Sequence, residues 1–244
     1  MAEWAAKRFW TDVSCVPEGA GFAVYLDTRP VRTPAKAPLI LPTLALAQAV
    51  AAEWLAQDSK IDPLTMPHTR SANAALDKVA PQRAAVESMI ADYCGTDLLC
   101  YRAPAPAGLI AAQSAAWDPL LGWARAEYGA ALNVTTGVMP VAQPAPALSA
   151  LTGVMAAMGD FDIVAFHDLV SLSGSFVLGL AVARGHIAPE TGWTLSRTDE
   201  DWQARQWGLD DEAAEKAAQK QAAFLHAHLF LTLANQEAKH NSAP

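Results

Sequence analysis

The chain has 244 residues, of which 52% are hydrophobic and 17% are charged, and its formal net charge at pH 7 is -8. This composition excludes a disordered tail and a small disulfide-stapled scaffold, because the chain carries enough apolar side chains for one large domain or two modest ones. The acidic balance disfavours nucleic acids and anionic membranes as partners, since binding to phosphates needs a basic face.

The cysteines and the apolar segments indicate the compartment. Cys15, Cys94 and Cys100 show neither the CxxC spacing of a metal site nor the pattern of a disulfide framework, which is typical of a reducing compartment. The first ten residues lack the apolar stretch of a secretory signal. The longest apolar run, residues 169–183, is shorter than the roughly 20 residues that span a bilayer. We therefore expect a soluble cytoplasmic protein.

The first forty residues carry the pattern of short β-strands. Residues 22–26 alternate between two faces, with Phe22, Val24 and Leu26 on one of them. Turn-forming residues flank this segment on both sides, and residues 31–33 resume an extended pattern, which predicts a hairpin. Residues 39–41, bracketed by prolines, are expected to add one more short strand.

A helix is predicted after these strands. Leu46, Val50 and Trp54 recur at four-residue steps, and Thr43 stands where an N-cap is expected. The pattern predicts a helix laid on a small sheet. Because Trp54 completes the apolar stripe of this helix, we expect it to be critical for the fold.

The remainder of the chain reads as helical. Residues 58–67 contain two prolines and no periodicity, so we place a domain boundary there. The predicted fold class is α+β, with a small β-rich α+β domain at residues 1–66 and a larger, mainly α-helical domain at residues 67–244. The longest helix is expected from about residue 210 to 236. Its end, residues 224–231, is apolar on most of its circumference, so we expect it to be packed from several sides.

No catalytic, metal or cofactor site is apparent. His226 and His228 are two residues apart, whereas metal ligands on one helix face need a spacing of three or four. His167 and Asp168 are adjacent in a predicted helix, where we expect their side chains to diverge. Residues 174–179 have the glycine separation of a phosphate-binding loop but lack the following Lys and Ser or Thr. We predict no metal and no cofactor.

One segment combines acidic and aromatic side chains. Residues 199–215 hold seven acidic residues and one arginine, with Trp202 and Trp207 among them. Such a composition is typical of a protein-binding surface, and equally of a solvated helix face whose charges serve solubility. Both interpretations remain open at this point.

A set of short motifs occurs in one order along nearly the whole chain, from about residue 8 to 236. They are Arg8-Phe9-Trp10, residues 26–34, Ala52-Glu53-Trp54, Ile61-Asp62-Pro63, residues 66–73, 97–102, 113–118 and 178–182, and Gln206-Trp207-Gly208. The ordered set resembles the family of assembly chaperones for the alpha subunit of the ATP synthase catalytic sector.

This resemblance implies a fold and a function. Such proteins have a small N-terminal α+β part and a larger helical part; they bind the free alpha subunit before it pairs with beta and prevent its aggregation without using ATP. Relatives in eukaryotes work in the mitochondrial matrix, and this chain is similar to a bacterial cytoplasmic member. The resemblance implies a chaperone, not an enzyme. It places partner contacts at Glu200 and Asp201 first, and with them at Asp199, Trp202, Gln203 and Trp207.

Two other classes of protein stay open at the level of sequence. A small-molecule enzyme would need a pocket assembled from dispersed residues such as His68, Arg70, Asp97 and Arg102. A permanent structural subunit would copurify with its complex in fixed ratio, whereas an assembly chaperone would be absent from the mature complex.

Overall fold

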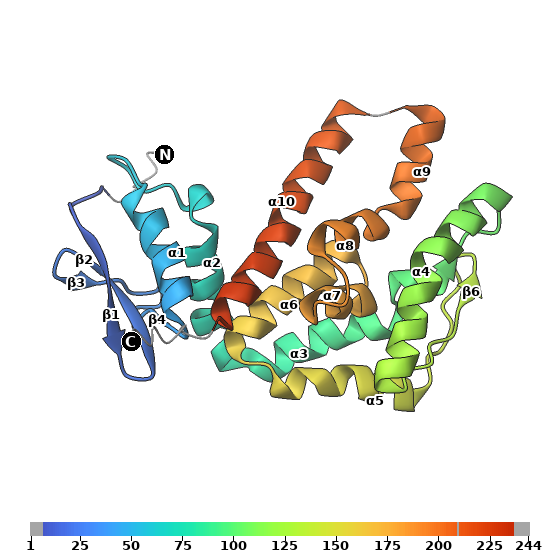
Figure 1. Cartoon of the computed structure of the whole chain (residues 1–244), viewed down its shortest axis with the longest axis horizontal. Helices are drawn as coiled ribbons and strands as arrows, with labels where there is room; N and C mark the ends of the chain where they lie inside the picture. The colour runs from blue at the N-terminus through green and yellow to red at the C-terminus, as the bar shows by residue number, and fades with distance from the viewer. Residues whose placement is uncertain (1–6, 209, 237–244) are drawn as a thin grey trace, which may run out of the picture. The chain divides into compact units, whose positions relative to one another are not determined.

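The computed structural model describes residues 7–208 and 210–236. A small β region is followed by a mostly helical part, which confirms the predicted α+β fold class (Figure 1). Residues 1–6, which belong to the N-terminal stretch without the pattern of a secretory signal, lie outside the described residues.

The N-terminal sheet is built around one central strand. Its strands are β1 (Val13–Glu18), β2 (Gly21–Leu26), β3 (Arg29–Pro30) and β4 (Ile40–Leu41). β2 pairs antiparallel with each of the other three. Gly21 is required at its start, because a Cβ there would lie 2.4 Å from the main-chain oxygen of Leu41. The alternation of residues 22–26 predicted β2, whereas the more exposed β1, which contains Pro17, escaped prediction.

The helical elements follow in order. They are α1 (Leu44–Leu55), η1 (Pro63–Thr65), α2 (Pro67–Ala74), η2 (Ala75–Val79), α3 (Ala80–Gly95), η3 (Leu98–Cys100), α4 (Ala107–Tyr128), α5 (Ala145–Thr152), η4 (Gly153–Ala157), α6 (Asp160–Ser173), α7 (Phe176–Ala183), α8 (Pro189–Ser196), α9 (Thr198–Trp207) and α10 (Asp211–Ala234). Two further short strands, β5 (Tyr101–Arg102) and β6 (Thr135–Thr136), pair in parallel.

The chain forms two compact units, each with its own interior. Among the described residues, the first unit comprises 7–83, 160–164 and 229–236, and the second comprises 84–159, 165–208 and 210–228. The boundary predicted at residue 66 falls inside the first unit, and the division into domains 1–66 and 67–244 stays a prediction.

Helix α1 packs on the sheet in the first unit and begins as predicted. The Oγ1 atom of Thr43 accepts a hydrogen bond from the backbone N–H of Leu46 at 3.1 Å, which confirms the N-cap. Leu46 and Val50 are fully buried. Trp54 is half-buried, and its ring lies edge-on to Trp10 with centroids 5.3 Å apart. Its critical role in the fold stays a prediction.

Glu53 fastens α1 to the start of α2. Met66 precedes α2 and makes no side-chain cap, so the first N–H groups of that helix need another acceptor. The Glu53 carboxylate accepts hydrogen bonds from the backbone N–H groups of His68 and Thr69 at 2.6 and 2.8 Å, and from Oγ1 of Thr69 at 2.7 Å. Two of the motifs found in the sequence thus meet in one interaction.

Removing this carboxylate should destabilise the first unit. In Glu53→Ala the N–H groups at the start of α2 lose their acceptor, so we expect the free energy of unfolding to fall by about 1–3 kcal/mol. Urea unfolding followed by circular dichroism measures the change, with Gln48→Ala as the control at an exposed position of the same helix. Equal stability of Glu53→Ala and the wild-type protein would contradict the capping role.

Asp97 plays a comparable part inside the second unit. Its side chain is fully buried and accepts hydrogen bonds from the backbone N–H groups of Leu99 at 2.9 Å and Val177 at 3.0 Å. It thereby joins η3 to the start of α7, a helix buried along residues 176–182. Burial raises the pKa of Asp97 to about 6, although the hydrogen bonds that it accepts oppose this rise.

This raised pKa predicts a pH dependence of stability. Folding makes the Asp97 carboxyl hold its proton more tightly, so its contribution is fully present below about pH 4 and is lost as the pH rises through about 6. Relative to Asp97→Asn, the wild-type protein should lose up to about 3 kcal/mol of unfolding free energy between pH 4 and 7. Denaturant unfolding at several pH values tests this, and parallel curves for the two proteins would disprove it.

Candidate functional site

Helix α9 carries the acidic and aromatic residues that the sequence singled out. Asp199, Glu200 and Asp201 occupy its first turn, where the positive end of the helix dipole favours negative charge. Gly208 follows its last residue with a φ of +93°, a conformation that favours glycine, and redirects the chain toward α10. None of the residues of α9 is buried, so this helix contributes surface to the second unit.

Two of the predicted partner-binding residues hold α9 against α4, and their role in partner binding stays a prediction. Oδ1 of Asp199 accepts a hydrogen bond from Nε2 of Gln113 at 2.7 Å, and Gln113 is buried on α4. The ring of Trp202 covers Gly108 so closely that a Cβ at Gly108 would lie 2.5 Å from a ring carbon. Asp199 and Trp202 therefore position the helix.

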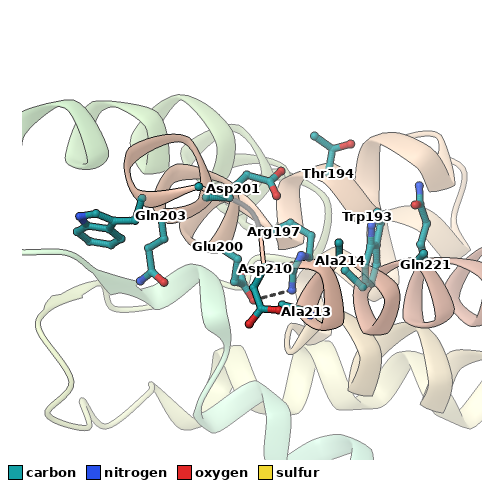
Figure 2. A pocket seen from close by; sticks show the side chains of 15 residues that line it. Trp193, Thr194, Arg197, Glu200, Asp201, Gln203, Asp210, Ala213, Ala214 and Gln221 are labelled. Carbon is teal, nitrogen blue, oxygen red and sulfur yellow. Dashed lines mark hydrogen bonds and ion pairs between the residues drawn. The ribbon is translucent and has the colours of Figure 1, made fainter.

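The other four predicted residues line one groove. Glu200, Asp201, Gln203 and Trp207 line, together with residues of α8 and α10, a hollow of about 660 Å³, whose lining residues all belong to the second unit; Figure 2 labels the first three. The remaining lining residues are Trp193, Thr194, Arg197, Ala204, Gly208, Asp210, Ala213, Ala214, Ala217, Ala218 and Gln221. The structure thus brings together four of the six residues that the sequence analysis assigned to partner binding.

The groove has a negative rim. Its lining includes the carboxylates of Glu200, Asp201 and Asp210 and the guanidinium of Arg197. Arg197 lies 2.9 Å from Glu200, so one of the three negative charges is matched, as the dashed line in Figure 2 indicates. Arg205 donates from Nε to the main-chain oxygen of Asp201, and it lines a neighbouring hollow toward α4 that Asp201 also borders. The site therefore favours a cationic group.

Trp207 is unusual among the tryptophans of this unit. Its side chain is 80% exposed, whereas Trp193 and Trp117 are 6% and 1% exposed. An indole in water leaves a large apolar area uncovered, and tryptophan is enriched among the residues that dominate binding energy at protein interfaces. Sequence reasoning grouped Trp202 with Trp207, but the structure gives them different surroundings.

Sequence reasoning missed the α10 side of the groove. Ala213, Ala214, Ala217 and Ala218 form one face of the helix, at a spacing that could have revealed it. The end of this helix is packed by several elements, as expected: Phe224 lies against Trp193 of α8, and Phe230 stacks with His68 of α2 and Phe161 of α6. Within residues 224–231 only Leu229 is exposed.

The expectation for His167 and Asp168 was wrong. The side chains of His167 and Asp168 do not diverge, because Nδ1 of His167 lies 3.0 Å from Oδ1 of Asp168. Both side chains are partly exposed, and neither belongs to the groove.

The four residues considered for a dispersed enzyme pocket do not form one site within either unit. His68 and Arg70 belong to the first unit, and Asp97 and Arg102 to the second. Asp97 caps helices, and Arg102 lies 2.8 Å from Asp118.

Over the part of the chain that the structure describes, no group of three His, Cys, Asp or Glu side chains could hold a metal ion. Across residues 7–208 and 210–236, every helix is too short or too polar to cross a membrane.

Comparison with known proteins relates this chain to a family and to solved structures. A family described as ATP12 chaperone protein matches residues 7–125. The crystal structure of Atp12 from Paracoccus denitrificans is 52% identical, covers 95% of this chain and 100% of its own, and superposes with a TM-score of 0.91. An aspartate-to-lysine variant of that protein is 51% identical, covers 96% of this chain and 100% of its own, and superposes with a TM-score of 0.92. A candidate chaperone from Agrobacterium tumefaciens is 40% identical, covers 94% of this chain and 86% of its own, and superposes with a TM-score of 0.89.

Proposed function

The chain belongs to the ATP12 chaperone family, and we propose that it binds the free alpha subunit of the ATP synthase catalytic sector and keeps it from aggregating until beta arrives. The observation that carries this proposal is the likeness to Atp12 over nearly the whole chain, both units included. The alpha subunit, the client in this proposal, is prone to aggregate when isolated, because it exposes the apolar surface that it later buries against its neighbours.

We assign the client contact to the groove between α9 and α10. Its exposed Trp207 supplies an aromatic anchor, and Glu200 and Asp201 supply charges that can steer a cationic partner. These contacts involve no buried residue of α9, so client binding can be altered there without disturbing the interior. Asp199 and Trp202 contribute indirectly, by holding α9 on α4.

The proposed activity needs no nucleotide and includes no catalysis. Within residues 174–179, the glycine spacing has a packing explanation: a Cβ at Gly179 would lie 2.8 Å from a methyl carbon of Val170, so glycine allows α6 and α7 to approach. Gly174 adopts a φ of +71° just before α7. Because packing explains these glycines, their spacing is no reason to expect a nucleotide site, which supports a protein that uses no ATP. We propose that it works in the bacterial cytoplasm.

The chaperone activity can be measured directly. Isolated alpha subunit, diluted into buffer without nucleotide, should scatter less light when this protein is present at near-stoichiometric ratio, because a bound chaperone covers the aggregating surface. An unrelated acidic protein at equal concentration is the control. Protection only after ATP is supplied, or hydrolysis of ATP by the purified protein, would refute the proposal of nucleotide independence.

Charge reversal tests the assignment of the contact. We expect the double variant Glu200→Lys with Asp201→Lys to bind the alpha subunit at least about tenfold more weakly at low salt, because attraction at the rim becomes repulsion. Its unfolding free energy should fall by no more than about 1–2 kcal/mol, because the variant loses the exposed Arg197–Glu200 ion pair and two negative charges at the start of α9 but no buried contact.

Glu215→Lys is the matched control, because Glu215 is exposed on α10 and does not line the groove. Isothermal titration at two salt concentrations gives the affinities. Normal affinity in a well-folded double variant would remove this rim from the contact surface.

A further inference from the structure

The first half of α10 lacks the internal packing that its second half has. Within residues 211–223 no side chain is buried, whereas Phe224 and Phe230 further along the same helix are fully buried. The groove-side residues Ala214, Ala217 and Gln221 are only half-buried, so this face keeps area that another molecule can cover. On the groove side this face consists of Ala213, Ala214, Ala217 and Ala218.

The shape of the groove suits a helix. Its lining residues come from the helices α8, α9 and α10, and Figure 2 labels residues of all three. Helices pack with their axes about 8–10 Å apart, the shorter distances requiring small side chains at the contact. The four alanines of α10 and Ala204 on α9 provide such a contact, while Trp207 offers a large apolar surface at one end.

Charge selects among helical occupants. Among the described residues, Asp201 and Asp210 form no salt bridge with a cation, and the carboxylate of Asp210 accepts from backbone N–H groups at the start of α10. A second copy of this chain would bring the same net charge of -8, and residues 211–223 of its α10 hold three acidic residues against two lysines, so like charges would repel overall. A helix that presents a lysine or arginine at this rim would be attracted.

We propose that the groove between α9 and the first half of α10 receives one amphipathic helix of the alpha subunit, with a basic side chain beside Asp201 and Asp210 and its apolar face against the alanines and Trp207. This inference rests on the proposed function and adds the kind of segment that is recognised. Recognition follows the helix-in-groove mode, in which anchors three or four residues apart enter a groove. The small alanines make the contact sensitive to added volume.

Filling the groove tests this occupant without changing any charge. Ala217→Phe places a ring where the client helix would lie, so we expect the affinity for isolated alpha subunit to fall at least about tenfold. Ala223→Phe is the matched control, because it makes the same substitution at an exposed position of α10 outside the groove. Circular dichroism confirms that both variants fold, and isothermal titration gives their affinities.

Cross-linking identifies the segment that binds. A photoreactive benzoylphenylalanine replaces Trp207, one large aromatic side chain for another, and the same group at Ala223 serves as the control. After illumination with isolated alpha subunit, peptides attached through position 207 should come from one amphipathic helix that carries a lysine or arginine, and position 223 should give little product. This arm decides the question even if Ala217→Phe fails to fold.

The outcomes separate the two proposals. Protection by the wild-type protein together with normal binding by Ala217→Phe would overturn the groove while leaving the chaperone function standing. A cross-link from position 207 to a strand or to a segment without a cation, or no cross-link there, would overturn the basic helix as occupant. Failure of the wild-type protein to bind the alpha subunit at all would overturn the proposed function and this inference with it.

Discussion

The client surface proposed for this protein depends on how α9 is attached. The hydrogen bond of 2.7 Å between Asp199 and the buried Gln113, together with the ring of Trp202 on Gly108, holds one side of the helix against α4. The opposite side, with Glu200 and Trp207, is thereby left facing α10 across an open groove. A helix with no buried residue keeps its place through these few contacts, so the groove persists without being filled by its own unit.

The features of the groove are consistent with temporary binding. An exposed tryptophan and a wall of alanines provide apolar area, yet the small side chains limit how much of it can be buried. The acidic rim adds long-range attraction, which speeds encounter more than it strengthens the final complex and weakens as salt is added. Such a surface can hold an aggregation-prone subunit and still release it when a larger complementary interface becomes available.

Periodicity predicted much of the fold because it reports burial directly. The alternation of residues 22–26 located the central strand, and Thr43 was correctly identified as a cap because its hydroxyl bonds Leu46 within one turn. The exposed edge strand β1 lacks that signal. The partner of the Glu53 carboxylate lies fifteen residues away at His68, so a local pattern could not reveal it. For the site, composition pointed to the acidic stretch, but only the packing of Trp202 on Gly108 separates positioning residues from those facing the groove.

The central claim is that the alpha subunit covers the groove between α9 and α10. Amide hydrogen exchange of this protein, measured alone and with isolated alpha subunit, tests it most directly, because a bound helix should slow exchange at the backbone beneath it. The account predicts protection concentrated in residues 200–207 and 211–221, with little change in β1 to β4. Protection confined to the first unit, with unchanged exchange along α9 and the first half of α10, would contradict it.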